Sequence, residues 1–316
     1  MRVFVTGADG FVGAWLVRRL LRDGHEVVGG TRPLDAGNGT LTRAERDAVQ
    51  WVPLELTAVD SVRRAVASGY DAVAHLAAVA SGAEAARDPG YAWEVNAAGT
   101  ARLAQALAEA KLAGRADPTM LVVSTGEVYG QGSAAPRREQ DPVAPCSPYA
   151  ASKLGAEVAA LETWRRAGLR VVVSRAFAHT GPGQDGRFVV PAFAERLRLA
   201  KKIGAPVIKV GNLEPVREFL HVDDVVDAYV RLLERGAPGE VYNVASGVPI
   251  SLGALLERLG ALFGVRPVAE ADPGLVRPAD IPYLVGDASK LRAATGWVPR
   301  HSLDDTLKDV VNASAD

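Results

Sequence analysis

The amino-acid sequence predicts an α/β fold in which a doubly wound parallel sheet is followed by a smaller α/β substrate region. Three observations support this prediction. Short β-branched runs alternate with longer amphipathic segments over residues 1–176. The runs are nearly continuous in apolar residues, as expected where helices cover both faces of a sheet. A glycine-rich turn, TGADGFVG at 6–13, joins the first run to the first amphipathic segment.

The predicted elements follow one another in a regular order. We expect strands at 2–6, 26–31, 51–56, 71–78, 119–124 and 170–176, and helices at 11–23, 59–68, about 91–113 and about 148–167. After about residue 177 the alternation stops, and prolines interrupt shorter elements. We therefore expect a dinucleotide-binding domain over 1–176, to which 216–245 returns, and a mainly substrate-binding domain over 177–316.

Composition argues against several classes of protein. The chain has 316 residues, of which 48% are apolar and 23% charged, and its net charge is −1, so no basic surface for nucleic acid or anionic membrane is expected. No apolar stretch approaches the roughly 18 residues of a membrane helix, and we expect a cytoplasmic protein. The single cysteine, Cys146, excludes an internal disulfide, and five scattered histidines lack metal-ligand spacing, so no metal is expected.

The glycine-rich turn predicts a binding site for a dinucleotide cofactor. Gly7 allows the tight turn, Gly10 lets the backbone approach a diphosphate, and Gly13 lets the helix pack closely on the strand. The amino terminus of the following helix supplies N–H donors and the positive end of its dipole. Because the turn stands between a predicted strand and a predicted helix, it has the context that the motif requires.

The choice of cofactor is predicted from the end of the second strand. Where proteins that bind NAD place an acidic residue, this chain has Thr31 and Arg32. The guanidinium group of Arg32 can pair with a 2′-phosphate, so NADP(H) is favoured. NAD(H) is the alternative if Arg32 points to solvent and Asp35 reaches the ribose instead.

Tyr149 and Lys153 form a candidate proton-transfer pair. They lie four residues apart, which places both side chains on one face of the predicted helix. A nearby lysine favours the phenolate and lowers the pKa of a tyrosine, which makes the tyrosine a usable acid. The alternative is a solvated helix face with a weak contact between the two residues.

Polar side chains follow the predicted strand 119–124. Ser124, Thr125 and Glu127 stand at its carboxyl end, where ligands bind in doubly wound sheets. We expect them to face a substrate bound over the cofactor, with Thr125 polarising a carbonyl group. A hydroxyl that caps a turn is the alternative for Thr125.

Together these motifs resemble the extended short-chain dehydrogenase/reductases that act on nucleotide sugars. The resemblance rests first on TGADGFVG (6–13), STGEVYG (124–130) and SPYAASK (147–153). It continues through RAFAHTGPGQ (175–184), VGNL (210–213), REFLHVDD (217–224), GEVYNVASG (239–247), RPADIP (277–282) and Gly296-Trp297. GPGQ, VGNL and RPADIP are similar to the branch that acts on GDP-sugars, and GEVYNVASG looks more like its reductases than its dehydratases.

The resemblance implies reduction of the C4 keto group of GDP-4-keto-6-deoxy-D-mannose to GDP-D-rhamnose by NADPH. Tyr149 would protonate the C4 oxygen, Lys153 would hold the nicotinamide ribose, and Thr125 would hydrogen-bond the same oxygen. Glu127 stands where the dehydratases of the branch place the base that removes the C5 proton. GDP-mannose 4,6-dehydratase and other nucleotide-sugar epimerases or dehydratases are therefore alternatives. An NADP-sensing protein without turnover is the non-enzymatic alternative.

The resemblance also implies contact residues for the cofactor and the substrate. Arg217 and Arg277 would clamp the GDP diphosphate, and surface ion pairs, for example to Glu214 or Asp280, are the alternative for them. The chain departs from the family pattern at Ala178 and Glu218, where Asn and Asp are usual. The cofactor positions are Gly7, Gly10, Phe11, Val12, Gly13, Thr31, Arg32, Glu55, Leu56, Leu76, Ala77, Ala78, Tyr149, Lys153 and His179, and the substrate positions are Thr125, Ala178, Phe188, Val189, Lys209, Arg217 and Arg277.

A homodimer is implied as well. Members of the family commonly pair two helices of each subunit across a two-fold axis as a four-helix bundle. The matching segments here are the predicted helices at about 91–113 and 148–167. The alternative is that their apolar faces only cover the sheet of their own subunit.

Overall fold

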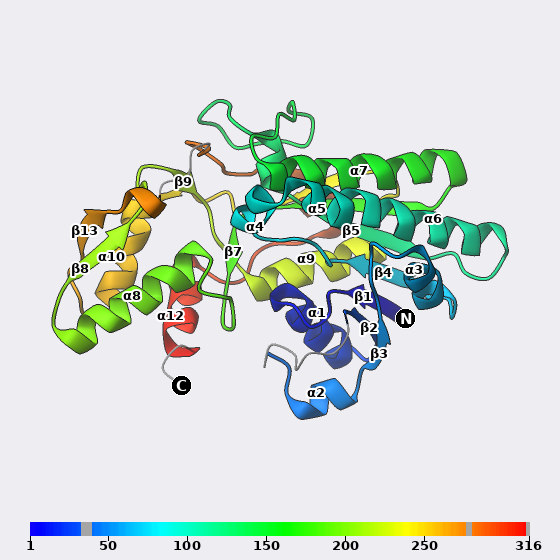
Figure 1. Ribbon diagram of the computed structural model, residues 1–316, viewed down its shortest axis with the longest axis horizontal. Coiled ribbons are helices and arrows are strands. Elements are labelled where there is room, and N and C mark those ends of the chain that lie inside the picture. The colour runs from blue at the N-terminus through cyan, green and yellow to red at the C-terminus, as the bar shows by residue number, and fades with distance from the viewer. Residues whose placement is uncertain (33–39, 276–279, 314–316) are drawn as a thin grey trace.

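A seven-stranded parallel sheet forms the centre of the molecule (Figure 1), in a computed structural model that describes residues 1–32, 40–275 and 280–313. The strand order is β11-β6-β5-β4-β1-β2-β3, so the direction of winding reverses between β1 and β4. This sheet confirms the predicted fold class. Its strands are β1 (Arg2–Thr6), β2 (Glu26–Thr31), β3 (Gln50–Pro53), β4 (Ala72–His75), β5 (Thr119–Thr125), β6 (Arg170–Ala176) and β11 (Val241–Val244).

Helices cover both faces of the sheet, and alternate residues of β1 show how. Val3 and Val5 pack in one buried cluster with residues of α1 (Phe11–Arg22), α9 (Val222–Arg235) and α11 (Ser289–Thr295). Phe4 points to the opposite face, into a cluster with α3 (Val59–Val66), α6 (Gly99–Leu112) and α7 (Pro148–Ala167). Two short helices, α4 (Gly82–Arg87) and α5 (Pro89–Trp93), add Ala85 and Ala92 to the second cluster, whereas α2 (Arg43–Asp47) has no buried residue.

A smaller α/β lobe with its own buried cluster lies beside the sheet, at the left of Figure 1. It packs α8 (Val189–Ile203) and α10 (Leu252–Phe263) against α12 (Leu303–Ala313) and the paired strands β8 (Val207–Val210) and β13 (Val268–Ala271). Two short strand pairs join the lobes, β7 (His179–Thr180) with β10 (Leu220–His221) and β9 (Val216–Arg217) with β12 (Ile250–Ser251). Because α9 and β11 pack in the main sheet, we propose that 216–245 belongs to the dinucleotide-binding domain.

All but three of the predicted elements match those observed to within two residues at each end, and three differ more. The strand expected at 71–78 ends at His75, because the next two N–H groups, of Leu76 and Ala77, turn to donate to Thr6 Oγ1 at 3.1 Å. The strand expected at 51–56 ends at Pro53. The helix expected at about 91–113 is α5, a π-helical turn at Glu94–Ala98, and α6.

The π-helical turn carries a buried polar side chain and a close helix contact. Within it, the side chain of Asn96 accepts a hydrogen bond from Val79 N at 2.8 Å and donates to Ser152 Oγ at 2.9 Å. Gly99, directly after the turn, packs so closely on Leu56 that an added Cβ would lie 2.9 Å from the Leu56 Cβ. Asn96 therefore forms a buried polar link between the loop after β4 and helix α7. Turns of this kind within α-helices are frequent at functional sites.

Helix α7 begins and ends where its sequence signals predict. Ser147 is the N-cap, and its hydroxyl accepts a hydrogen bond from Ala150 N at 3.1 Å. Pro148 stands at the first helical position, and the helix ends at Gly168, whose φ of 67° suits a left-handed cap. Tyr149 therefore lies in the first turn of α7 and Lys153 one turn later.

Candidate active site

The predicted cofactor turn lies at the carboxyl edge of the sheet, where β1 and β4 end side by side. Thr6 pairs with His75 in the register of these strands. Gly7 has a φ of 68°, and a Cβ there would lie 3.0 Å from the backbone of Ala77. A Cβ on Gly13 would lie 2.0 Å from Gly7 O, so only glycine fits where α1 crosses the turn. The structure thus brings together the predicted cofactor positions of two separate segments.

The first turn of α1 suits the diphosphate of a dinucleotide. Its N-cap, Gly10, provides no side-chain hydrogen bond, and the first turn contains no acidic residue. Because Gly10 has no side chain, it does not cap the N–H groups of Phe11 and Val12. Both residues are only partly buried. An uncapped helix terminus with a positive dipole end is a binding site for anions.

The ribose end of the site contains an acid that was not predicted from the sequence. Thr31, the last residue of β2, is buried, and its hydroxyl donates to Asp9 Oδ2 at 2.6 Å. Arg32 is exposed, and its Nη1 donates to the hydroxyl of Tyr91 at 3.0 Å. In the sequence, the only indication of this acid is that Asp9 lies within the glycine-rich turn. Asp35, the alternative acid, lies outside the described residues.

Further predicted cofactor positions follow β3 and β4. Glu55 is held by its backbone N–H, which donates to Ser61 Oγ at 2.9 Å, and Leu56 is buried. Leu76, Ala77 and Ala78 continue from β4 and are partly buried. Their contact with a cofactor stays a prediction.

Thr125 and Tyr149 meet where β5 ends and α7 begins. The Thr125 side chain accepts from Glu127 N at 3.2 Å, which leaves its hydroxyl hydrogen to be donated, and it forms a hydrogen bond with the Tyr149 phenol. Burial raises the pKa of Tyr149 well above its usual range, and the Glu127 carboxylate raises it further. The hydrogen bond with Thr125 lowers the pKa of the phenol, but by less than burial raises it. The phenol therefore keeps its proton at neutral pH.

The expectation that Lys153 lowers the pKa of Tyr149 is wrong for the structure described. The groups that shift the phenol are its buried surroundings, Glu127 and Thr125. Lys153 is itself only 6% exposed. Burial lowers the pKa of its ammonium group to about 8, and the Glu157 carboxylate, one turn further along α7, acts in the opposite direction.

A buried ion pair that was not predicted from the sequence lies behind Lys153. Glu157 is 2% exposed, and its Oε2 lies 2.8 Å from Arg175 Nη2 on β6. Ser124, expected to face the substrate, instead donates its hydroxyl to Glu157 Oε1 at 2.5 Å, which corrects that prediction. The signal for Glu157 was its spacing of four residues from Lys153 on one helix.

Two histidines lie close to the cofactor segments. The ring of His75 is buried between Thr6 Oγ1 at 2.8 Å and Thr100 Oγ1 at 2.9 Å, and burial lowers its pKa to about 3. His75 is therefore neutral and serves to join β1, β4 and α6. His179 Nδ1 lies 2.9 Å from Phe177 O, and burial lowers its pKa as well. Its contact with a cofactor stays a prediction.

Arg217 forms the ion pair that was the alternative to a diphosphate clamp. Its Nη2 lies 2.7 Å from Asp280 Oδ1, and its Nη1 donates to Ile281 O at 2.6 Å. A diphosphate at Arg217 would share or replace these contacts, and the clamp stays a prediction. Arg277 lies outside the described residues.

The other substrate positions belong to the small lobe or its border. Ala178 and Val189 pack against its buried cluster, Phe188 is the N-cap of α8, and the Lys209 side chain is exposed on β8. Their contact with a substrate stays a prediction.

Glu218, the second departure from the family pattern, joins two loops to its own segment. It is fully buried and accepts hydrogen bonds from the N–H groups of Ser246, Gly247 and Gly286 at 2.7, 3.0 and 2.9 Å. Burial raises the pKa of its carboxyl group to about 7, while the three N–H donors act in the opposite direction. Glu218 thus fixes the loops around the strand that carries Arg217.

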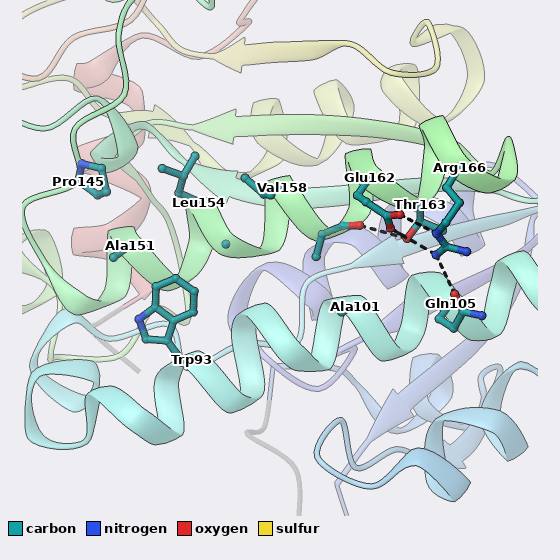
Figure 2. Close-up of a pocket in the computed structure, with 12 residues that line it drawn as sticks. Trp93, Ala101, Gln105, Pro145, Ala151, Leu154, Val158, Glu162, Thr163 and Arg166 are labelled. Atoms are coloured by element: carbon teal, nitrogen blue, oxygen red, sulfur yellow. Dashed lines mark hydrogen bonds and ion pairs between the residues drawn. The ribbon is translucent and has the colours of Figure 1, made fainter.

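An apolar groove of about 710 Å³ runs along the outer side of α6 and α7. Figure 2 shows Trp93, Leu154 and Val158 along it, with Arg166 bound to Gln105 and Glu162 at one end. Trp93 is 46% and Val158 60% exposed. The groove lies on the two helices for which a dimer contact was expected.

The described residues show neither a metal cluster nor a membrane span. No three His, Cys, Asp or Glu side chains among them are arranged to hold a metal ion, and no helix in that part of the chain has the length and apolar character needed to cross a membrane. The expected absence of a metal stays a prediction.

Comparison with known proteins supports an enzyme of nucleotide-sugar metabolism. Residues 4–310 match the family model described as GDP-mannose 4,6 dehydratase. The GDP-6-deoxy-D-mannose reductase of Pseudomonas aeruginosa is 38% identical over 245 residues, 77% of this chain and 79% of that protein.

Solved structures agree with the sequence relatives. The structure of RMD from Pseudomonas aeruginosa complexed with NADPH superposes with a TM-score of 0.82 at 34% identity, covering 99% of this chain and 98% of that one. The UDP-glucose 4-epimerase of Thermus thermophilus in complex with NAD gives a TM-score of 0.85 at 30% identity, over 99% and 98% of the two chains.

The buried Lys153 predicts a pH-dependent stability. Its pKa is about 8 in the folded protein and ordinarily 10.5, so between these values the unfolded chain binds the additional proton and the free energy of unfolding rises with pH. At about 1.4 kcal/mol per pKa unit, wild type should gain about 3 kcal/mol relative to Lys153→Met between pH 7.5 and 10.5. Urea unfolding at both pH values measures this. Lys201→Met, on an exposed lysine, is the control, and parallel pH profiles of wild type and Lys153→Met would contradict the prediction.

Proposed function

Because the chain belongs to the extended short-chain dehydrogenase/reductases that modify nucleotide sugars, we propose that it reduces the C4 keto group of GDP-4-keto-6-deoxy-D-mannose to GDP-D-rhamnose with NADPH. As a member of this family it is an NAD(P)-dependent nucleotide-sugar oxidoreductase. The observation that carries the proposal is the placement of the Tyr149 phenol beside the Thr125 hydroxyl, where α7 begins and β5 ends, since reduction of a ketone requires a proton donor at its oxygen. The relative named as a GDP-6-deoxy-D-mannose reductase supports the choice of substrate.

The proton reaches the substrate from Tyr149. In this proposal the phenol donates to the C4 oxygen, and the Thr125 hydroxyl, whose oxygen accepts from Glu127 N–H, donates a second hydrogen bond to the same oxygen. Lys153 keeps its charge below about pH 8 and would hold the nicotinamide ribose, as the family resemblance implies. Bound NADPH would supply the hydride. Gly7, Gly10 and Gly13 shape the turn against which its diphosphate would lie.

The proposed preference for NADP(H) rests on Arg32. Its guanidinium group is exposed at the end of β2, where a 2′-phosphate would lie. The similar RMD structure is a complex with NADPH, whereas the similar epimerase structure is a complex with NAD, so both cofactors occur among these relatives. NAD(H) therefore remains the alternative cofactor.

Dehydration is the second candidate function, and Glu127 is the observation that favours it. The Glu127 carboxylate is close enough to Tyr149 to raise the pKa of the phenol. A carboxylate in that place is the base that removal of the C5 proton requires. A GDP-mannose 4,6-dehydratase would use the same Thr125, Tyr149 and Lys153.

Substrate contacts and location are part of the same proposal. We assign Arg217 and Arg277 to the GDP diphosphate because guanidinium groups bind phosphate oxygens in pairs. At Arg217 the diphosphate would compete with Asp280, which now holds the side chain. A nucleotide-sugar substrate and a cytoplasmic location are typical of the family.

We also propose that the protein is a homodimer through the groove on α6 and α7. A surface of apolar side chains as exposed as Trp93 and Val158 marks an interaction site. A second copy of the same two helices would present the same apolar face, so a two-fold axis would form a four-helix bundle.

A stoichiometric test separates reductase from dehydratase. With GDP-4-keto-6-deoxy-D-mannose and NADPH we expect one NADPH consumed per molecule of product, followed by absorbance and mass spectrometry. With GDP-mannose and catalytic NADP we expect no reaction. Formation of the 4-keto sugar without net cofactor turnover would contradict the reductase proposal and support dehydration.

Replacement of the acid tests whether turnover occurs at this site. Tyr149→Phe removes the proton donor, so we expect kcat to fall by about 10²-fold or more while NADPH still binds. Tyr70→Phe is the control, because its hydroxyl bonds to Ala65 O near the opposite edge of the sheet. Undiminished turnover in Tyr149→Phe would remove the phenol from the mechanism, and a wild type that binds NADPH but turns nothing over would favour the sensor.

A charge in the groove tests the dimer. Val158→Glu should convert a dimer to a monomer in analytical ultracentrifugation, because a carboxylate would be buried without a partner. Leu199→Glu on α8, where the side chain is 57% exposed, is the matched control and should leave the dimer intact. A monomeric wild type, or a Val158→Glu variant that stays dimeric, would contradict the proposed interface.

A further inference from the structure

We propose that Asp9 is a selectivity residue for the cofactor, which favours an unphosphorylated ribose and opposes Arg32. The consequence is a site that accepts NADH as well as NADPH. This inference rests on the proposed function in one respect, namely that the ligand of the glycine turn is a nicotinamide dinucleotide.

The position of Asp9 follows from the packing of two loops. Gly7 N donates to Gly30 O at 2.8 Å, which fixes the glycine turn against the end of β2. Asp9 follows two residues later and meets Thr31, the last residue of that strand, with the Thr31 hydroxyl 2.6 Å from Asp9 Oδ2. In doubly wound folds the end of the second strand is where the ribose hydroxyls of the cofactor are bound. Asp9 therefore supplies from the turn the carboxylate that the strand lacks.

The hydrogen bond from Thr31 decides what the carboxylate can do. Because Thr31 is buried and donates to Oδ2, the Asp9 side chain is held at the strand end and is not free to turn away. Oδ1 has no hydrogen-bond partner among the described residues, and the side chain is only partly buried. A ribose 2′-hydroxyl can donate to such an oxygen. A 2′-phosphate, with about two negative charges, is repelled by it.

Arg32 does not neutralise this carboxylate. Its Nη1 donates to the Tyr91 hydroxyl on α5, and no ion pair joins Arg32 to Asp9 in the described part of the chain. The site therefore presents a fixed anion and an exposed cation to one end of the cofactor. Each favours a different ribose, because a carboxylate accepts from the hydroxyl and a guanidinium binds the phosphate.

Equilibrium binding tests the inference without relying on turnover. Dissociation constants for NADPH and NADH are measured by quenching of protein fluorescence, for wild type and Asp9→Asn at low salt. In wild type we expect the two constants to lie within about tenfold of each other. In Asp9→Asn we expect the preference for NADPH over NADH to increase by about tenfold or more, because the repulsion is removed. Added salt should reduce this difference.

Controls separate a charge effect from a change in structure. Asp23→Asn makes the same charge change at the other end of α1 and should leave the ratio of the two constants unaltered. Asp9→Ser is the second variant if Asp9→Asn does not fold. The role of Asp9 would be overturned if the ratio of the NADPH and NADH dissociation constants in the folded variant lay within about twofold of the wild-type ratio. An equal weakening of binding for both cofactors would overturn it as well. The stoichiometric test of the reductase does not depend on this ratio, so each proposal can fail alone.

Discussion

The burial of the Lys153 ammonium group beside Glu157 is the constraint on which the candidate site depends. A cation removed from water is costly unless a nearby anion compensates it. Glu157 provides that anion, but it is itself buried and must be satisfied by Arg175 on β6 and Ser124 on β5. Helix α7 and two central strands are thereby linked, and the first of these carries Tyr149 and Lys153 while β5 ends at Thr125.

The burial of Tyr149 itself determines the protonation state of its phenol. Tyr149 lies in the first turn of α7, in buried surroundings that disfavour its phenolate, and the Glu127 carboxylate adds to this effect. A phenol of this kind keeps its proton until a substrate oxygen arrives to receive it. The Thr125 oxygen accepts from the backbone of its own turn, and its side chain is hydrogen-bonded to the phenol, so the two groups stand side by side.

The cofactor end of the molecule shows how two weak sequence signals can oppose each other. Arg32 stands where the end of the second strand predicts the determinant of cofactor choice, and it favours NADP(H). Asp9 lies in the glycine turn, where the sequence predicts a cofactor role for the glycines and none for the aspartate. The fold brings this carboxylate to Thr31, the neighbour of Arg32. In our proposal the preference between NADPH and NADH therefore depends on Asp9 and Arg32 together, which lie more than twenty positions apart in the chain.

The class of fold, the cofactor turn and the pair of Tyr149 and Lys153 could be predicted from the chain alone, because glycine spacing, strand patterning and the helical repeat are local properties. Much less could be predicted after residue 177, where short elements carry no clear period. Which side chains face the site depends on the folded arrangement: Ser124 turns to Glu157, Arg217 to Asp280, and Asp9 to Thr31. The physical reason is that a buried charge or hydroxyl takes the nearest partner in space. That partner is set by packing between segments distant in sequence.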